Sequence, residues 1–217
     1  IFTAFLFIVG ISLAFSLSRH HGSERRQPWV YCRVARRTVI LFGLGLLLNT
    51  LEHLPWWPTL STLSIPGVLQ RIAIVYGVTS LLMLHLSPRR QAYVAAGCLL
   101  VYWAIMALVP VPGYGAGVLT PEGNLAAYID NLLLPGHLWQ TTWDPEGILS
   151  TIPALATTLF GGLAGLWLGT PRDPYEKVAG LFVMGSVAMV LGMTWDQVFP
   201  INKQLWTTSF AVFMAGL

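Results

Sequence analysis

The stretch Ile148–Gly169, ILSTIPALATTLFGGLAGLWLG, decides the fold because none of its 22 residues is charged. As an α-helix it would be about 33 Å long, enough to cross the ~30 Å hydrocarbon core of a bilayer. Comparable apolar runs recur at Ile1–Leu17, Thr38–Leu51, Pro66–Leu86, Ala92–Val111, Val178–Trp195 and Trp206–Leu217. A bilayer offers the backbone no water to bond, so helices are the default. The sequence predicts an all-α, polytopic transmembrane bundle of about seven spans, the first and last truncated.

Composition supports this class. The 217 residues are 55% hydrophobic and only 10% charged, whereas soluble domains carry about 25% charged residues. A disordered chain, a nucleic-acid-binding arm and an ordinary soluble enzyme are excluded, which leaves the lipid bilayer as the expected surroundings. Cys32 and Cys98 are isolated and predict neither a disulfide framework nor a metal site.

The ends and the loops carry further information. Ile1 and Leu217 both lie inside apolar runs, so we expect residues 1–217 to be one partial transmembrane domain of a longer protein. Loops 19–37, 87–91 and 170–177 hold ten of the twelve Lys and Arg residues. The positive-inside rule places these loops in the cytoplasm. The run Thr38–Leu51 is short, and we expect it to borrow the turn before it, where Arg36 and Arg37 can snorkel.

The opposite side receives one long connection, residues 112–147. It contains two Gly- and Pro-rich clusters, and between them Asn124–Leu134 is amphipathic. This pattern predicts a short helix on the outer membrane surface. Long structured loops on a rigid scaffold are frequent locations of functional sites.

Arg71 is the strongest single candidate for a site. It lies about one turn inside the span Pro66–Leu86, where a charge costs a few kcal/mol and is usually retained for a partner or ligand. Its guanidinium could bind a phosphate or carboxylate. Alternatively, Arg71 snorkels to the outer interface, or pairs structurally with an acid such as Glu146. Gln70 shares its neighbourhood.

Four further polar residues lie on the predicted outer side. Asp144 could cap the helix Ile148–Gly169, with Pro145 at its first position and Glu146 in its first turn. Alternatively, Asp144 or Glu146 orients a catalytic histidine or an acceptor hydroxyl. Asn202 and Lys203 open the last span, where Lys203 either anchors the interface or faces the same cavity as Arg71.

Two other patterns have simpler interpretations. Gly161, Gly165 and Gly169 repeat every four residues, which predicts a close-packing seam between helices. No two of the five histidines have metal-ligand spacing, and His137 is the best placed of them for acid–base chemistry. The residues alone do not distinguish an enzyme from a transporter.

Five stretches, in this order, give the chain a family resemblance. They are Phe5–Gly10 (FLFIVG), Ile65–Arg71 (IPGVLQR), Ala127–Asp130 (AYID), Asp144–Leu149 (DPEGIL) and Pro200–Trp206 (PINKQLW). Together they resemble the heparan-alpha-glucosaminide N-acetyltransferase family, including its bacterial members. The resemblance covers essentially the whole chain.

The resemblance implies a membrane enzyme that moves an acetyl group from cytoplasmic acetyl-CoA to an amino sugar or glycan across the membrane. In bacteria this would be the inner (plasma) membrane. Gln70 and Arg71 match the family's VLQR motif, Asp144 and Glu146 match DPEG, and Asn202 and Lys203 match its NK-x-LW pattern. These six residues are the expected substrate-binding residues. The family's catalytic histidine precedes the stretch matching Phe5–Gly10, so none of the histidines here is expected to replace it. A homodimer is a further expectation.

Two other classes remain open. A carrier of a small sugar or anion would predict internal repeats in two matched halves, and the chain has none. A non-catalytic membrane scaffold would need neither an arginine inside a span nor a long Gly-rich outer loop.

Overall fold

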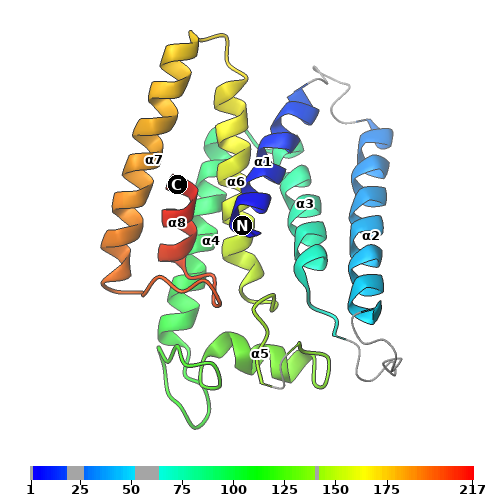
Figure 1. Cartoon of the computed structure of the whole chain (residues 1–217), viewed down its shortest axis with the longest axis vertical. Coiled ribbons are helices and arrows are strands. Elements are labelled where there is room, and N and C mark those ends of the chain that lie inside the picture. The colour runs from blue at the N-terminus through cyan, green and yellow to red at the C-terminus, as the bar shows by residue number, and fades with distance from the viewer. Residues whose placement is uncertain (1, 19–26, 52–63, 140–141) are drawn as a thin grey trace.

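The computed structural model describes residues 2–18, 27–51, 64–139 and 142–217. Its helices are α1 (Phe2–Ser18), α2 (Pro28–Leu51), α3 (Val68–His85), α4 (Pro88–Leu108), α5 (Leu125–Leu133), α6 (Thr151–Leu168), α7 (Pro174–Asp196) and α8 (Thr208–Gly216) (Figure 1). The described residues contain no strand, only an isolated bridge between Val111 and Gly115. The all-α class predicted from the sequence is confirmed.

The seven predicted apolar runs each correspond to a helix. Helices α2, α3, α4, α6 and α7 are long and apolar enough to cross a membrane, and α1 is a shorter apolar helix of 17 residues. Helix α2 begins at Pro28. The short run Thr38–Leu51 is therefore extended by turns that carry Arg36 and Arg37, as the sequence predicted.

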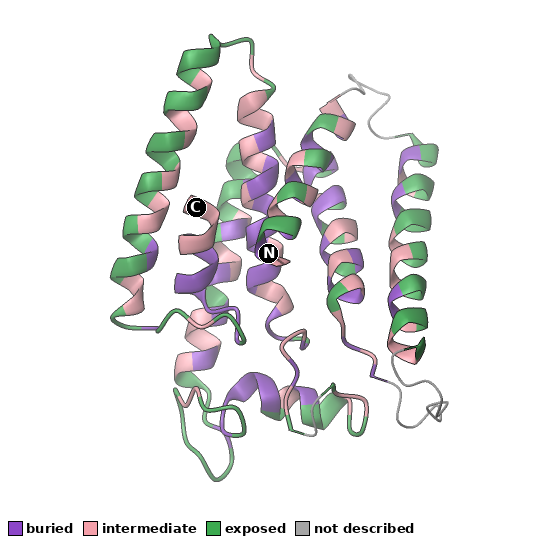
Figure 2. Ribbon diagram, viewed as in Figure 1, coloured by how far each residue is buried: buried purple, intermediate pink, exposed green. Residues whose placement is uncertain are grey.

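Helix α6 lies inside the bundle, and α1 packs closely against it (Figures 1 and 2). The contact is backbone to backbone: a side chain at Gly161 would overlap the Phe7 carbonyl, and one at Gly10 would overlap the Thr158 carbonyl. Gly165 lies against Ala14 and Ile11 in the same way. The predicted seam is therefore confirmed for Gly161 and Gly165. It is wrong for Gly169, which is the C-cap of α6 and lies against the carbonyls of its own helix.

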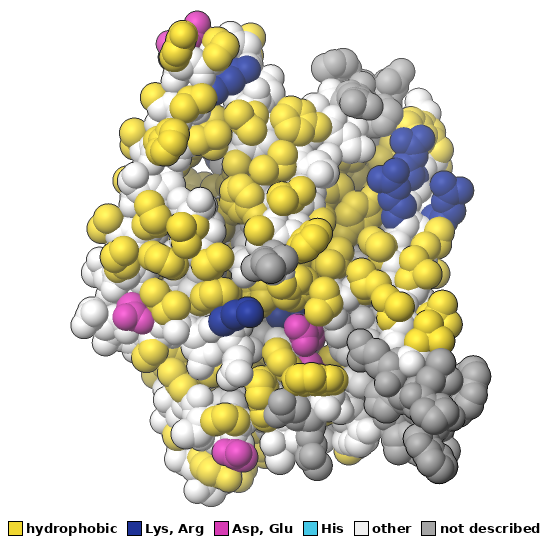
Figure 3. All heavy atoms as spheres, in the orientation of Figure 1, with side chains coloured by type: hydrophobic (Ala, Val, Ile, Leu, Met, Phe, Trp, Pro, Cys, Tyr) yellow, Lys and Arg dark blue, Asp and Glu magenta, His cyan; other side chains and the backbone are white. Residues whose placement is uncertain are grey.

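The outer helices α2 and α7 present most of their side chains to the surroundings (Figure 2). Large apolar side chains such as Val39, Leu47, Phe182 and Val190 are more than half exposed. Hydrophobic atoms accordingly cover much of the visible face of the molecule, while Lys and Arg side chains gather on one part of α2 (Figure 3). Exposed apolar faces of this kind suit lipid as their solvent.

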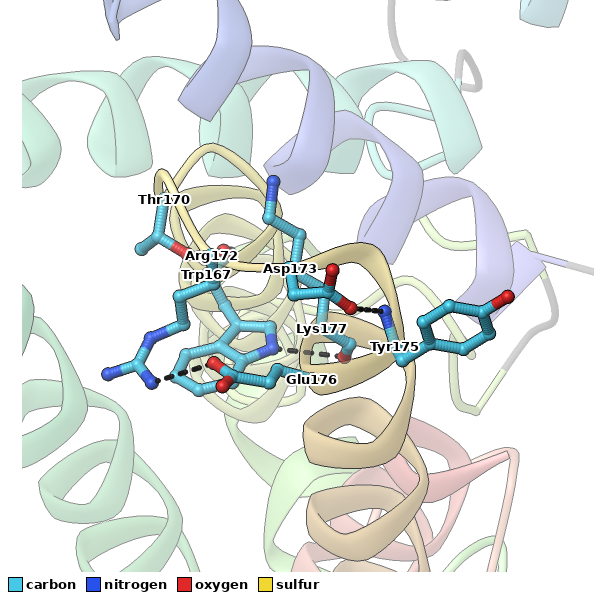
Figure 4. Close-up of polar contacts among 7 residues, drawn as sticks. All are labelled: Trp167, Thr170, Arg172, Asp173, Tyr175, Glu176 and Lys177. Atoms are coloured by element: carbon cyan, nitrogen blue, oxygen red, sulfur yellow. Dashed lines mark hydrogen bonds and ion pairs between the residues drawn. The ribbon is translucent and has the colours of Figure 1, made fainter.

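The two ends of the bundle differ. One end carries the α6–α7 turn, where Asp173 caps α7 by accepting a hydrogen bond from the Tyr175 N–H at 2.8 Å (Figure 4). Beside it, the Trp167 indole N–H donates to the Lys177 carbonyl at 3.1 Å.

At the other end, α5 lies roughly perpendicular to the long helices (Figure 1). Its N-cap is Asn124, whose side chain accepts from the Ala127 N–H. This confirms the short helix predicted at Asn124–Leu134. Helix α5 buries one side, including Leu125 and Asp130, and exposes Leu132 and Leu133.

Candidate functional site

Arg71 lies in the first turn of α3, and its side chain is directed toward the segment that precedes α6. The residue is only 1% exposed. One guanidinium nitrogen, Nη2, donates to the Pro145 carbonyl at 2.7 Å, to Ser150 Oγ at 2.5 Å and to the Gly147 carbonyl at 3.3 Å. The guanidinium carbon lies 5.2 Å from the centroid of the Trp206 ring, within the range of a cation–π contact.

The other two guanidinium nitrogens of Arg71, Nε and Nη1, are buried and have no hydrogen-bond partner. No carboxylate of the described residues forms an ion pair with Arg71. The structure therefore excludes both a snorkelling arginine and a direct pair with Glu146. An unpartnered buried donor costs about 1–3 kcal/mol, and more when it is charged. Arg71 thus presents one free, cationic hydrogen-bonding edge inside the protein.

Asp144 and Glu146 lie beside Arg71, but Asp144 does not cap α6. That expectation is wrong: α6 begins at Thr151 with Ser150 at its N-cap. The two oxygens of Asp144 accept from the Trp139 N–H at 2.9 Å and the Glu146 N–H at 2.8 Å. Asp144 therefore organises the loop before the helix, so that the loop's carbonyls are turned toward Arg71.

Burial raises the pKa of both acids above its ordinary value, and the nearby charge of Arg71 opposes that shift. Glu146 and Asp144 are the two acids whose negative charge acts most strongly on Arg71. Neither forms an ion pair with it, so the site combines one cation with carboxylates that are near but not in contact. Such an arrangement leaves two guanidinium nitrogens of Arg71 without an acceptor among the described residues.

Gln70 points elsewhere. Successive residues of a helix project about 100° apart, and Gln70 lies against Gly45 of α2, where an added side chain would meet its amide. Gln70 is 3% exposed, and neither its Oε1 nor its Nε2 has a partner. The predicted pair is therefore divided: Arg71 contacts the segment before α6, and Gln70 lies in the α2–α3 interface.

Asn202 and Lys203 form the turn before α8. The Asn202 side-chain oxygen accepts from the Gln204 and Leu205 N–H groups at 2.9 and 3.2 Å. Lys203 is exposed. The same turn positions Trp206, whose ring lies against the Arg71 guanidinium. Asn202 and Lys203 are therefore connected to the Arg71 site through Trp206 and not through their own side chains.

Two residues of the site were missed by the sequence analysis. Trp206 ends the PINKQLW stretch but was not assigned to the site, yet it is 2% exposed and has a φ of 50°, a conformation that is uncommon for a bulky residue. Its indole N–H donates to Thr157 Oγ1 at 3.2 Å, and its ring contacts Phe2 and Phe210 edge to face. The second residue, Asp130 of α5, is fully buried. The signals for it were its place at the end of the AYID stretch and an acid on a largely apolar short helix.

Of the histidines in the described residues, neither His85 nor His137 is a hydrogen-bond partner of Arg71. His85 lies at the opposite end of α3, with Nε2 at 3.1 Å from the Tyr31 hydroxyl. The His137 carbonyl accepts from the Ile65 N–H. His20, His21 and His53 lie outside the described residues, as do Arg19, Arg25 and Arg26 of the basic loops. Within the described ranges, no three His, Cys, Asp or Glu side chains are grouped as metal ligands.

A helical bundle with membrane-length apolar helices and a buried, partly unpaired arginine at one end defines a polytopic membrane protein with an internal polar site. Comparison with known proteins narrows the class. The chain is similar to heparan-alpha-glucosaminide N-acetyltransferase of Mus musculus, with 25% identity over an alignment of 271 positions covering 99% of the chain. The enzyme of the same name from Homo sapiens is 25% identical over 100% of the chain.

The chain spans about two fifths of the length of these relatives, 41% and 40% respectively. No family model matches the chain. The resemblance inferred from the five sequence stretches is thus confirmed, and it extends over nearly the whole chain.

Proposed function

We propose that the protein is a membrane acetyltransferase that passes an acetyl group from acetyl-CoA to an amino group of a sugar or glycan. The observation that carries the proposal is the buried Arg71, whose Nε and Nη1 have no partner. The similarity to two N-acetyltransferases over nearly the full chain supports the class of reaction.

The chemistry of the reaction fits the free edge of Arg71. A neutral amine attacks the thioester carbonyl, the new C–N bond forms, and the C–S bond breaks as CoA leaves as a thiol with the proton lost by the amine. Negative charge develops on the carbonyl oxygen during the attack. Donors held in place and shielded from water stabilise such an oxyanion strongly. Nε and Nη1 of Arg71 are donors of this kind, held through Nη2 by the segment before α6.

The other proposed substrate-binding residues have supporting roles. Asp144 and Glu146 shape the segment that holds Arg71 and counter its charge. Asn202 forms the turn that places Trp206 over Arg71. Lys203 is exposed at the same end and suits an anionic or hydroxyl-rich acceptor. Gln70 offers an unpartnered amide at the α2–α3 interface. The base that accepts the amine proton is, in this proposal, the histidine that the family resemblance places ahead of Phe5–Gly10.

We further propose that the end with the basic segments faces the cytoplasm of a bacterial cell and that α5 faces outward. Arg33, Arg36, Arg37, Arg89, Arg90, Arg172 and Lys177 then lie on the acetyl-CoA side, as the positive-inside rule predicts. The acceptor glycan approaches from the α5 side. A homodimer in the membrane is part of the same proposal.

The decisive experiment uses the complete protein in proteoliposomes. Radiolabelled acetyl-CoA is supplied on one side and glucosamine-containing glycans on the other. Label is expected to reach the glycan, and Arg71→Ala should lower the rate by about 10²–10³-fold, the effect of removing one oxyanion donor. Arg172→Ala, at the far end of the bundle, is the matched control and should leave the rate within twofold. Passage of unmodified glycan without any acetylation would instead support the carrier class.

A further inference from the structure

Asp130 of α5 makes a contact that the sequence analysis did not anticipate. Its side chain is fully buried, and Oδ1 accepts a hydrogen bond from the Ile148 N–H at 2.9 Å. The second oxygen, Oδ2, is buried without a hydrogen-bond partner. It lies where a side chain at position 147 would begin, so that any Cβ at Gly147 would overlap it. A side chain at position 147 would therefore displace the carboxylate of Asp130, whereas the backbone angles of Gly147 do not themselves demand glycine.

The same short segment is held from its other side by Arg71. Arg71 Nη2 donates to the carbonyls of Pro145 and Gly147. Ser150 Oγ also accepts a hydrogen bond from Nη2, and it donates in turn to the Gly147 carbonyl at 3.1 Å. Gly147 thus contacts Asp130 at its α-carbon and Arg71 at its carbonyl oxygen. Because a peptide unit is planar and stiff, displacing one face of this residue displaces the other.

Charge connects the two residues as well. Burial raises the pKa of Asp130 to about 6, an effect that Asp144 reinforces, while the Ile148 N–H and the charge of Arg71 oppose it. Asp130 is thus predominantly ionised at pH 7. Its carboxylate then holds the Ile148 N–H with a charge-assisted hydrogen bond, which is stronger than a neutral one.

We propose that Asp130 is a positioning residue of the Arg71 site. Through Gly147 and Ile148 it fixes the segment that binds Nη2, and it thereby sets the direction in which Nε and Nη1 face the acyl group. This inference rests on the proposed acetyltransferase function. Asp130 itself touches neither substrate in this assignment.

The test uses four variants of the complete protein: Asp130→Ala, Asp130→Asn, Gly147→Ala and the double variant Asp130→Ala with Gly147→Ala. Asp130→Ala is expected to lower kcat about tenfold while KM for acetyl-CoA stays within twofold. Asp130→Asn should recover most of kcat, because the amide oxygen still accepts from the Ile148 N–H. Gly147→Ala should be at least as damaging as Asp130→Ala. When Asp130 is already alanine, Gly147→Ala should lower kcat by less than a further twofold, because its methyl group then enters the space that the carboxylate has left.

Asp173→Ala is the matched control. Asp173 also accepts a backbone N–H at 2.8 Å, at the opposite end of the bundle (Figure 4). Its loss should lower the melting temperature in detergent and leave kcat unchanged. A wild-type kcat in Asp130→Ala would overturn the inference, as would an Asp130→Asn variant no better than Asp130→Ala.

Failure of the proposed function has a different signature. If the wild-type protein transfers no acetyl group, that function is contradicted, and the inference is judged on melting temperatures. A further double variant then combines Asp130→Ala with Arg71→Ala. Its loss of melting temperature should be well below the sum of the two single losses, as expected for residues that hold one segment. Additive shifts would overturn the positioning role.

Discussion

Arg71 and Arg172 are two of the arginines that lie over a tryptophan ring, yet they are held in opposite ways. The guanidinium of Arg172 is 4.8 Å from the centroid of Trp167, and that of Arg71 is 5.2 Å from the centroid of Trp206. Arg172 is half exposed and forms an ion pair with Glu176 at 3.4 Å (Figure 4). Arg71 is buried, forms no ion pair within the described residues, and leaves two of its nitrogens without partners.

The difference separates a structural arginine from a functional candidate. At the α6–α7 turn, water and Glu176 satisfy the charge, so the arrangement costs little and contributes little. Beside α6, desolvation of Arg71 is only partly offset by carbonyls and a hydroxyl. A charge held at that cost within a membrane-length helix is expected to have a ligand. Burial combined with incomplete pairing, and not the presence of an arginine beside an aromatic ring, distinguishes Arg71 as the candidate.

The comparison is tested most strongly by exchanging each arginine for lysine, which keeps the charge. Lysine has a single ammonium group and lacks the planar fork of arginine. It cannot both bind Pro145 and Ser150 and present a free edge. Arg71→Lys is therefore expected to lower acetyl transfer on the order of 10²-fold. Arg172→Lys should stay within twofold, since lysine can also pair with Glu176. Equal rates for the two lysine variants would remove the distinction between the two ends.

A second test uses pH. The pKa of Asp130 is raised from 3.8 to about 6, so the folded protein binds more protons than the unfolded chain between these two values. Stability contributed by this group is present at low pH and is lost as pH rises through about 6. Asp144 and Glu146, whose pKa values are also raised, act in the same direction. Asp130→Asn should remove a pH-dependent contribution of at most roughly 3 kcal/mol.

The measurement for this second test is thermal unfolding in detergent between pH 4 and pH 7. The decline in melting temperature with rising pH should be shallower in Asp130→Asn than in the wild type. Gly97→Ala, whose added methyl would meet nothing within 4 Å, is the neutral control and should keep the wild-type slope. An unchanged slope in Asp130→Asn would mean that burial does not control this carboxylate.

The smallest effect is expected at the exposed pair. Glu176→Gln should destabilise the protein by about 0.5 kcal/mol or less, and high salt should abolish that difference because it screens exposed charges. Thermal unfolding at low and high ionic strength measures it. A difference above roughly 1 kcal/mol that persists in high salt would show that the α6–α7 turn depends on its ion pair after all.

Most of the fold could be predicted from the sequence because apolar runs and basic loops are local signals. The extension of α2 beyond its apolar run and the existence of α5 followed from Arg36, Arg37 and the amphipathic pattern of 124–134. The start of α6 did not. Asp144 followed by Pro145 has the composition of a helix N-terminus, but hydrogen bonds within the loop take up the side chain instead: Asp144 accepts from the Trp139 and Glu146 N–H groups.

The candidate site was predictable only in part, for a similar reason. Arg71 stands out because a charge inside an apolar run is rare. Gln70 was assigned to the same neighbourhood by adjacency, although helix geometry sends it toward α2. Asp130 and Trp206 were missed because an acid on a surface helix and a tryptophan at a span end are ordinary features of membrane proteins. Their importance comes from contacts with residues distant in sequence, Gly147 and Arg71, which periodicity does not reveal.

The glycine seam between α1 and α6 has a mechanical consequence. With main chain against main chain at Gly10 and Gly161, no side chain at these two positions can change rotamer and let the helices slide. We therefore expect the two helices to move together as one unit. Under the proposed function, any opening that admits the substrates is expected at other helix contacts. The remaining joints are those where side chains separate the helices, such as the one between α2 and α3.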